Sequence, residues 1–223
     1  MPDYLPLCAF RQELLPVACR SCAWWQTAGN GPKDADVAGE KRHQWMVALE
    51  PTWGSTGLLL AGNGSAAGAD SAGRSAAPVV VASINYAPAA ALPRFRDLPF
   101  APLPAGAVLL FCLWSEEDGG RSRARRLLHK ALAQLKERDL EEVYAVATLT
   151  AGPESTDRCN FFSLRFLDAN GFEQVADNGQ LFLMRADLRG LMSLITQAEA
   201  AVRRLLHSDP TPSPAAWTRR GGS

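Results

Sequence analysis

The sequence of 223 residues has no long apolar run and no excess of charge of either sign. No stretch approaches the roughly 18 apolar residues that a membrane-spanning helix needs. Lys and Arg together number 23, as do Asp and Glu, which argues against binding nucleic acid or an anionic membrane through overall charge. The first ten residues also lack the basic start and apolar stretch of a secretory signal. We therefore expect a soluble, cytoplasmic protein that does not bind membranes.

Cysteine and histidine are scarce, with five and three residues, which restricts metal sites and disulfides. The odd cysteine count and irregular spacing do not form a disulfide framework. A structural zinc site usually needs a second pair of ligands, and the CxxC spacing occurs once, at Cys19 and Cys22 in CRSCAWWQ. Because two tryptophans follow directly, we interpret this segment as core packing and expect no bound metal. A zinc site and a redox pair remain as alternatives.

Apolar patterns predict an order of elements that is typical of a mixed α/β protein. We expect strands at 56–62, 78–88, 107–114 and 141–149, helices at 36–50, 124–135, 160–169 and 191–207, and a hairpin over 172–188 that turns at 177–179. Residues 62–77 are small, polar and without periodicity, so they predict a flexible hairpin insertion, and residues 208–223 predict a disordered tail. The expected fold is a single domain over residues 1–207, with a mixed sheet, helices on both faces and an added C-terminal helix.

The segment 107–135 has the features of a phosphate-binding unit. Its first eight residues are apolar, as in a strand that is buried on both faces. The following turn is rich in small residues, which let backbone N–H groups approach a ligand at a helix N-terminus. Four arginines add positive charge there: Arg121, Arg123, Arg125 and Arg126. The segment therefore predicts a pyrophosphate cradle, although it matches neither the Rossmann nor the Walker spacing.

Two other interpretations of the arginines stay open. They can form a solvated basic face on a surface helix. They can also bind nucleic acid, but no aromatic residues alternate with them, so we expect no nucleic-acid partner.

Five segments of the chain occur in the order of a known group of enzymes: CRSCAWWQ, KRHQWMVALEPTWGSTG, NYAPAAALPRF, GGRSRARRLL and LDANGFEQV. In this respect the chain resembles an actinobacterial branch of the GNAT superfamily of acyl-CoA N-acyltransferases. The similarity extends over about residues 12–207. It implies a GNAT-like fold, acetyl-CoA or another acyl-CoA as substrate, and direct transfer of the acyl group to an amine of unknown identity, on a small molecule or a protein.

The resemblance also assigns residues. The backbone of Leu113 and Trp114 would hold the pantetheine arm, and Asn160 matches the asparagine that precedes the last strands in the superfamily. The pyrophosphate cradle would be formed by Gly119, Gly120, Arg121, Ser122, Arg123, Ala124 and Arg125. The segment CRSCAWWQ would pack against the sheet or line the acceptor cleft.

Several positions depart from the superfamily pattern. Gly119 replaces the leading Arg or Gln of the cradle, Leu167 replaces the usual tyrosine acid, and Ala105 or Gly106 replaces the usual acidic base. None of these side chains moves a proton, but positioning of the reactants alone supplies much of the rate of such a transfer. Tyr144, on the neighbouring predicted strand, is the candidate catalytic residue, and a core tyrosine is the alternative interpretation.

Two further functions compete with an N-acetyltransferase. One is a catalytically degenerate GNAT-like protein that binds acyl-CoA or a protein partner. The other is a zinc-dependent interaction module built on Cys19 and Cys22. The amphipathic helix predicted at 191–207 could pair two copies in a homodimer or cover the sheet.

Overall fold

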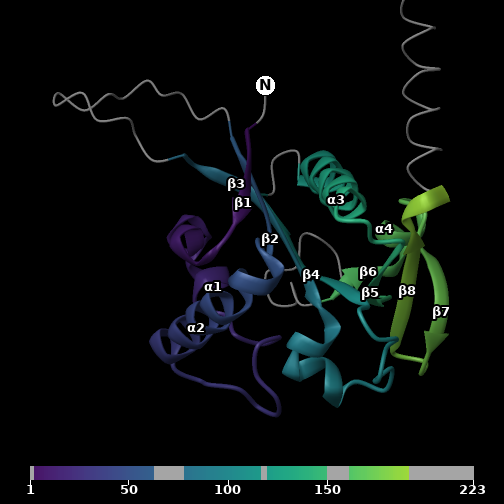
Figure 1. Cartoon of the computed structure of the whole chain (residues 1–223), viewed down its shortest axis with the longest axis horizontal. Coiled ribbons are helices and arrows are strands. Elements are labelled where there is room, and N and C mark those ends of the chain that lie inside the picture. The colour runs from purple at the N-terminus through teal and green to yellow at the C-terminus, as the bar shows by residue number, and fades with distance from the viewer. Residues whose placement is uncertain (1–2, 63–77, 117–119, 150–160, 191–223) are drawn as a thin grey trace, which may run out of the picture.

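The structure, a computed structural model, describes residues 3–62, 78–116, 120–149 and 161–190. Its centre is a twisted eight-stranded sheet in the order β1-β2-β3-β4-β5-β8-β7, with β6 paired to β5 (Figure 1). Neighbouring strands are antiparallel except β4–β5 and β5–β6, which are parallel. The strands are β1 Asp3–Leu7, β2 Gly57–Ala61, β3 Val80–Pro88, β4 Val108–Ser115, β5 Glu142–Thr148, β6 Phe162–Ser163, β7 Glu173–Asp177 and β8 Leu181–Asp187.

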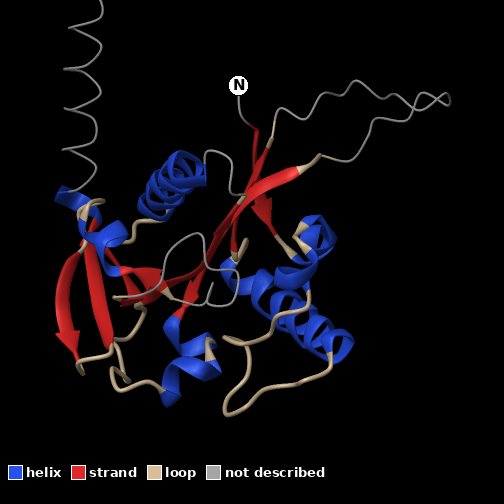
Figure 2. Ribbon diagram, turned by 180° about the vertical axis from the view of Figure 1, so that it is seen from behind, coloured by secondary structure: helices blue, strands red, loops and turns tan. Residues whose placement is uncertain are grey.

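Helices cover both faces of the sheet. Figures 1 and 2 show α3 and α4 on one face and α1 and α2 on the other. The helical segments are η1 Ala9–Leu14, α1 Val17–Arg20, α2 Ala35–Trp53, η2 Ala89–Ala91, η3 Pro93–Asp97, α3 Gly120–Glu137 and α4 Leu164–Asp168. The predicted fold class, a mixed α/β sheet with helices on both faces, is confirmed.

Strand β4 is buried on both faces, as its apolar run predicts. Val108 and Leu110 pack into the core beneath α3, whereas Leu109 and Phe111 pack into the core on the face of α2. All four side chains are fully buried. Because successive strand residues point to opposite faces, a strand between two helical layers needs apolar residues at every position.

Helix α3 is attached by a stripe of leucines and begins one turn before the predicted start at residue 124, at Gly120. Leu127, Leu128, Leu132 and Leu135 are fully buried. Burial of one such side chain contributes about 1.5–3 kcal/mol of transfer free energy. The stripe therefore holds the helix N-terminus close to the end of β4.

Helix α2 ends later than the sequence pattern predicts. Its N-terminus is capped by Asp34, whose Oδ1 accepts hydrogen bonds from the backbone N–H groups of Asp36 and Val37 at 3.0 and 2.9 Å. The helix continues through Pro51 to Trp53, and Gly54 caps its C-terminus with a φ of +82°. The N–H of Gly54 bonds to the carbonyl of Glu50 at 2.8 Å and closes the last turn, so the proline does not break the helix at residue 50.

In the C-terminal half, one predicted helix is confirmed only in part and one predicted hairpin is confirmed. Among the described residues 161–169, only α4 is helical, because Phe162 and Ser163 form β6 beside β5. Strands β7 and β8 form the predicted hairpin, and Gly179 supplies the positive φ of its turn, +85°. The predicted helix 191–207, the tail 208–223 and residues 63–77 of the predicted insertion lie outside the described residues.

The sequence also failed to predict β1. This short strand lies at the sheet edge and pairs antiparallel with β2, with Pro6 opposite Leu58. A proline is tolerated on an edge strand because one side of the strand needs no ladder hydrogen bonds.

Candidate functional site

The parallel strands β4 and β5 pair over only part of their length. Their ladder joins Val108, Leu109 and Leu110 to Val143, Tyr144 and Ala145. Beyond that point β5 pairs with β6 instead, through Ala147 and Thr148. Within the described residues, no strand pairs with this edge of β4 from Phe111 to Ser115. The backbone N–H and C=O groups of this edge are therefore not bonded to a described strand, although β6 lies close to β4, and an unpaired strand edge can bind an extended ligand.

A kink in β4 marks the place where the strands separate. On the side of β3, Asn85 pairs with Phe111 and Ser83 pairs with Trp114, so β4 carries one extra residue. Cys112 lies in this bulge with a φ of +50°, a left-handed conformation that is rare for residues other than glycine. A bulge bends its strand and increases the local twist, which turns the end of β4 away from β5.

Leu113 and Trp114, the predicted pantetheine-binding residues, lie on the unpaired edge. The half-buried Leu113 side chain packs against the core under α3, whereas the half-buried Trp114 packs against a core of the opposite face. Both side chains therefore leave the sheet plane, and the backbone remains in it. The backbone role that the resemblance implies stays a prediction.

Helix α3 begins directly beyond this edge, and its start is too crowded for a side chain. A Cβ added to Gly120 would lie 2.9 Å from Oγ of Ser115. That hydroxyl is buried and has no hydrogen-bond partner in the described part of the chain. A buried hydroxyl without a partner is costly, so the end of β4 holds a polar group that a ligand could satisfy. Gly119 lies outside the described residues.

The other cradle residues divide by exposure. Ala124 is buried against the sheet, whereas Arg121, Ser122 and Arg125 are exposed. Arg123 is half-buried, and its Nη1 lies 3.4 Å from Oε2 of Glu116. Asn160 lies outside the described residues. The structure thus gathers the described cradle residues at one helix end, with backbone, small and basic groups together.

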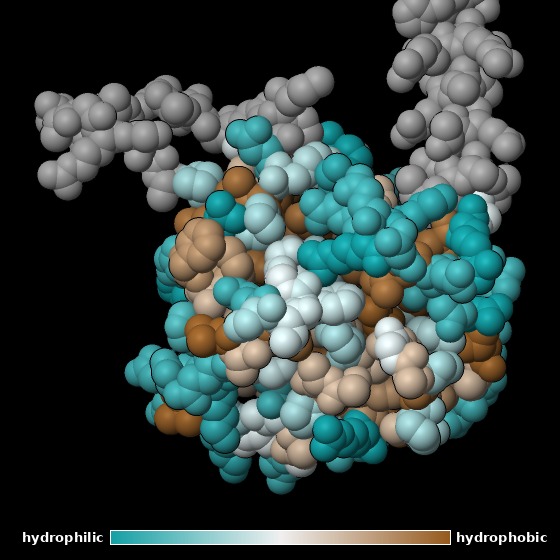
Figure 3. Space-filling view, in the orientation of Figure 1, coloured by the Kyte–Doolittle hydropathy of each residue, from teal (hydrophilic) through white to brown (hydrophobic). Residues whose placement is uncertain are grey.

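The arginines oppose the dipole of their own helix. Arg121, Arg125 and Arg126 have no ion-pair partner among the residues that the structure describes, and the first turn has no acidic residue. Cations near a helix N-terminus are unfavourable, and anions there are favourable. The exposed surface over α3 is strongly hydrophilic (Figure 3). An anion bound at this end would therefore pair with the arginine charges and also interact favourably with the helix dipole.

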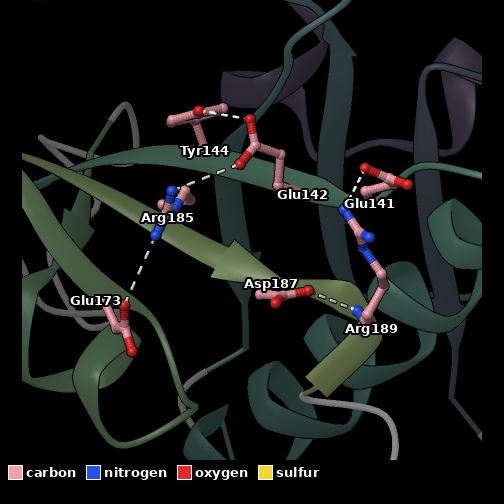
Figure 4. A network of polar contacts seen from close by, with 7 residues as sticks. All are labelled: Glu141, Glu142, Tyr144, Glu173, Arg185, Asp187 and Arg189. Atoms are coloured by element: carbon pink, nitrogen blue, oxygen red, sulfur yellow. Dashed lines mark hydrogen bonds and ion pairs between the residues drawn. The ribbon is translucent and has the colours of Figure 1, made fainter.

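Tyr144, the predicted catalytic residue, lies away from this region. It belongs to the paired part of β5, opposite Leu109, and its side chain packs in the core on the face of α2. Its hydroxyl donates a hydrogen bond of 2.7 Å to Oε1 of Glu142, toward the amino end of the strand (Figure 4). The strands separate in the opposite direction, so the structure does not bring this hydroxyl to the cradle.

The segment CRSCAWWQ contributes to an aromatic group beside the kink. Trp25 is only 1% exposed, and its ring centroid lies 5.6 Å from that of Phe111 on β4. The rings of Trp24 and Phe161 also contact each other in this group, with centroids 5.3 Å apart. Trp45 of α2 also contacts Phe111, with ring centroids 6.3 Å apart. The predicted packing of the two tryptophans is confirmed.

Cys19 and Cys22 are half-buried beside α2. In the described part of the chain, no group of three or more His, Cys, Asp or Glu side chains is arranged to hold a metal ion. None of the described helices is long and apolar enough to cross a membrane.

Sequence reasoning missed a buried polar chain that reaches the kink. Arg42 of α2 is 2% exposed, and its Nη2 donates to Oδ1 of Asn85 at 2.6 Å. Nδ2 of Asn85 donates in turn to the carbonyl oxygen of Cys112 at 3.1 Å. Arg42 lies between Lys41 and His43 in the polar stretch EKRH, and this local sequence gives no sign that its side chain faces the core.

Comparisons with known proteins give structural likenesses alone. No protein-family model matches the chain, and no curated protein matches it either. PaiA N-acetyltransferase from Thermoplasma acidophilum, in complex with coenzyme A, is 14% identical over 84% of this chain and 99% of its own, with a TM-score of 0.49.

Two further solved structures are comparable. Ribosomal-protein-alanine N-acetyltransferase from Brucella melitensis is 16% identical over 83% of this chain and 99% of its own, with a TM-score of 0.47. An N-acetyltransferase from Staphylococcus aureus is 13% identical over 84% of this chain and 99% of its own, with a TM-score of 0.48. At such low sequence identities and TM-scores, the chemistry of this chain has to be inferred from its own residues.

Proposed function

We propose that this protein is an acyl-CoA-dependent N-acyltransferase that uses acetyl-CoA as donor and an amine as acceptor. One observation carries the proposal: β4 and β5 are parallel and separate after Leu110 and Ala145, which leaves a strand edge that no described strand pairs with, next to an arginine-rich helix N-terminus. An extended ligand with amide groups and a terminal pyrophosphate fits both features. The order of the five sequence segments supports the same function.

The edge of β4 and the start of α3 would divide the donor between them. The two amides of the pantetheine arm would add to the backbone of Leu113 and Trp114 as an extra strand. The pyrophosphate would lie at the start of α3, where backbone N–H groups, Arg121 and Arg125 attract it. The orphan hydroxyl of Ser115 is close enough to Gly120 to join this cradle.

The transfer itself needs a neutral amine close to the thioester. The amine nitrogen attacks the carbonyl carbon, a C–N bond forms, and the C–S bond breaks. CoA leaves as the thiolate, and the proton of the new ammonium group passes to water or to the thiolate. Holding both reactants in line supplies much of the rate acceleration, even without an acid or base at the site.

The residues at the positions of the usual acid and base cannot transfer a proton, which favours a slow reaction. Leu167 is fully buried and apolar, and Gly106 lies in an exposed turn with a φ of +80°. Tyr144 remains a predicted catalytic residue, but its hydroxyl is held by Glu142. This favours a second candidate function, a protein that binds acyl-CoA without transferring the acyl group.

Calorimetric titration with acetyl-CoA and with CoA tests the proposal. We expect micromolar binding that weakens about tenfold when Arg121 and Arg125 are both replaced by Ala, which removes two charge contacts. The matched control is Lys136→Ala, an exposed basic residue at the other end of α3. Absence of binding at millimolar ligand would overturn both candidate functions.

A transfer assay then separates the two candidates. With saturating acetyl-CoA and a panel of amines, release of CoA that depends on the amine identifies an acyltransferase. Tight binding without amine-dependent release over hours identifies the binding protein.

A further inference from the structure

The guanidinium of Arg42 is buried, with no carboxylate partner among the residues that the structure describes. Its side chain is 2% exposed, and no acidic residue in the described part of the chain forms an ion pair with it. Its hydrogen bonds go to Oδ1 of Asn85 at 2.6 Å and to the carbonyl of Cys22 at 3.4 Å, and Nε has no hydrogen-bond partner among the described residues. A buried charge is retained only at a cost, so this arrangement needs an explanation beyond stability.

Asn85 passes the effect of this charge to β4. It is 3% exposed and uses both ends of its amide, Oδ1 toward Arg42 and Nδ2 toward the carbonyl of Cys112. The bond from the cation is charge-assisted and therefore strong. An amide that accepts from a cation is polarised and becomes a better donor, which strengthens its bond to Cys112.

The carbonyl that Asn85 holds belongs to the residue that kinks β4. Cys112 has a φ of +50°, in a bulge position where glycine is the usual residue. A non-glycine residue keeps this conformation only when its surroundings enforce it. Nδ2 of Asn85 donates a side-chain hydrogen bond of 3.1 Å to the backbone carbonyl of this residue.

We propose that Asn85, oriented by Arg42, is a positioning residue that holds Cys112 in its left-handed conformation and so keeps the edge of β4 open for the acyl-CoA arm. Arg42 also bonds to Cys22, so the segment CRSCAWWQ is tied to the same kink. The link to acyl-CoA rests on the proposed function. The link to the shape of β4 does not.

Asn85→Asp is the informative substitution. It keeps the size of the side chain and an acceptor for Arg42, but it cannot donate to Cys112 and places negative charge against that carbonyl. We expect amide exchange over residues 111–115 to become about tenfold faster in the ligand-free protein, the usual effect of losing one such hydrogen bond. The affinity for acetyl-CoA should fall by about the same factor.

Cys112→Gly separates two roles of Asn85: holding the left-handed conformation of Cys112, and contributing to stability in general. Glycine adopts positive φ without penalty, so the kink no longer needs the clamp. We expect Asn85→Asp to change the exchange rate and the affinity by less than about threefold in the C112G background, that is, with strong coupling between the two sites.

Tyr86→Phe is the matched control. Tyr86 follows Asn85 on β3, is fully buried and also bonds through its side chain, to Ser55 and Gln134. It points into the core under α3, so its substitution should lower stability without changing exchange over residues 111–115.

Two results would overturn the proposal. One is unchanged exchange over residues 111–115 in Asn85→Asp, and the other is an equal effect of this substitution with and without Cys112→Gly. If the wild-type protein does not bind acetyl-CoA, the proposed function fails, whereas exchange in the ligand-free variants still decides the role of Asn85.

Discussion

The hydroxyl of Tyr144 donates a hydrogen bond of 2.7 Å to Oε1 of Glu142, two residues earlier on β5. Glu142 also forms an ion pair with Arg185 of β8 at 3.7 Å, and Arg185 reaches Glu173 of β7 at 3.8 Å (Figure 4). The tyrosine is therefore the inner end of a polar row across three strands. This row lies on the paired side of β5, away from the opening between β4 and β5.

Replacing Tyr144 with Phe should leave acyl transfer almost unchanged. Its hydroxyl is bound to Glu142 and points away from the unpaired edge of β4. We expect kcat for acetyl transfer to stay within about threefold of wild type, because general acid catalysis, where it acts, contributes about 100-fold or more. Steady-state kinetics with saturating acetyl-CoA measure this, and a loss beyond about 100-fold would establish the catalytic role that the sequence predicts.

The same hydroxyl gives stability a dependence on alkaline pH. Burial, then the hydrogen bond to Glu142 and its negative charge, raise the pKa of Tyr144 to about 12, above its unfolded value of about 10. A raised pKa stabilises the fold fully below the unfolded pKa, and this contribution is lost as the pH rises through the folded pKa.

The unfolding free energy of wild type relative to Tyr144→Phe should therefore be constant below pH about 10 and fall between pH about 10 and 12. Urea denaturation of both proteins over this range measures the difference. A constant difference up to pH about 12 would show that the phenol titrates normally in the fold.

Binding of acetyl-CoA should weaken with salt. If Arg121, Arg125 and Arg126 attract the phosphates, rising ionic strength screens them, because the Debye length falls to about 8 Å at physiological salt. We expect Kd to increase severalfold between low and physiological salt, and this increase to be smaller in the Arg121→Ala, Arg125→Ala double variant. An equal salt dependence in both proteins would place the phosphates elsewhere.

Truncation of the α3 stripe should destabilise the protein strongly. Leu132 is fully buried on the side of α3 that faces the sheet. Leu→Ala at such a site costs about 2–5 kcal/mol of unfolding free energy. The exposed Lys136→Ala on the same helix should stay within about 0.5 kcal/mol of wild type. Equilibrium denaturation compares the two, and similar costs would contradict the packing of α3 on the sheet.

The elements with strong periodicity could be predicted from the sequence. The apolar run of β4 and the leucine stripe of α3 follow from the need to bury one face or both, so their positions were right to within a few residues. The start of α3 was missed by a turn because polar and glycine residues before the stripe carry no apolar pattern. Strand β6 was missed because its two residues pair only through contact with β5.

The features of the site could be predicted only in part. The arginines and small residues at the start of α3 are visible in the sequence, because their chemistry is local. The separation of β4 from β5, the positive φ of Cys112 and the burial of Arg42 depend on contacts between residues far apart in the chain. The orientation of Tyr144 depends on which face of β5 points into the core that contains Trp25 and Phe111, and the alternation of residues alone does not decide this.

Hydrogen–deuterium exchange with and without saturating acetyl-CoA tests the central claim most directly. If the donor binds along the unpaired edge of β4, backbone amides over residues 111–115 gain protection, together with those at the start of α3. Peptides from β7 serve as the internal control and should not change. Binding without protection of residues 111–115 would contradict the claim that this edge is the acyl-CoA site.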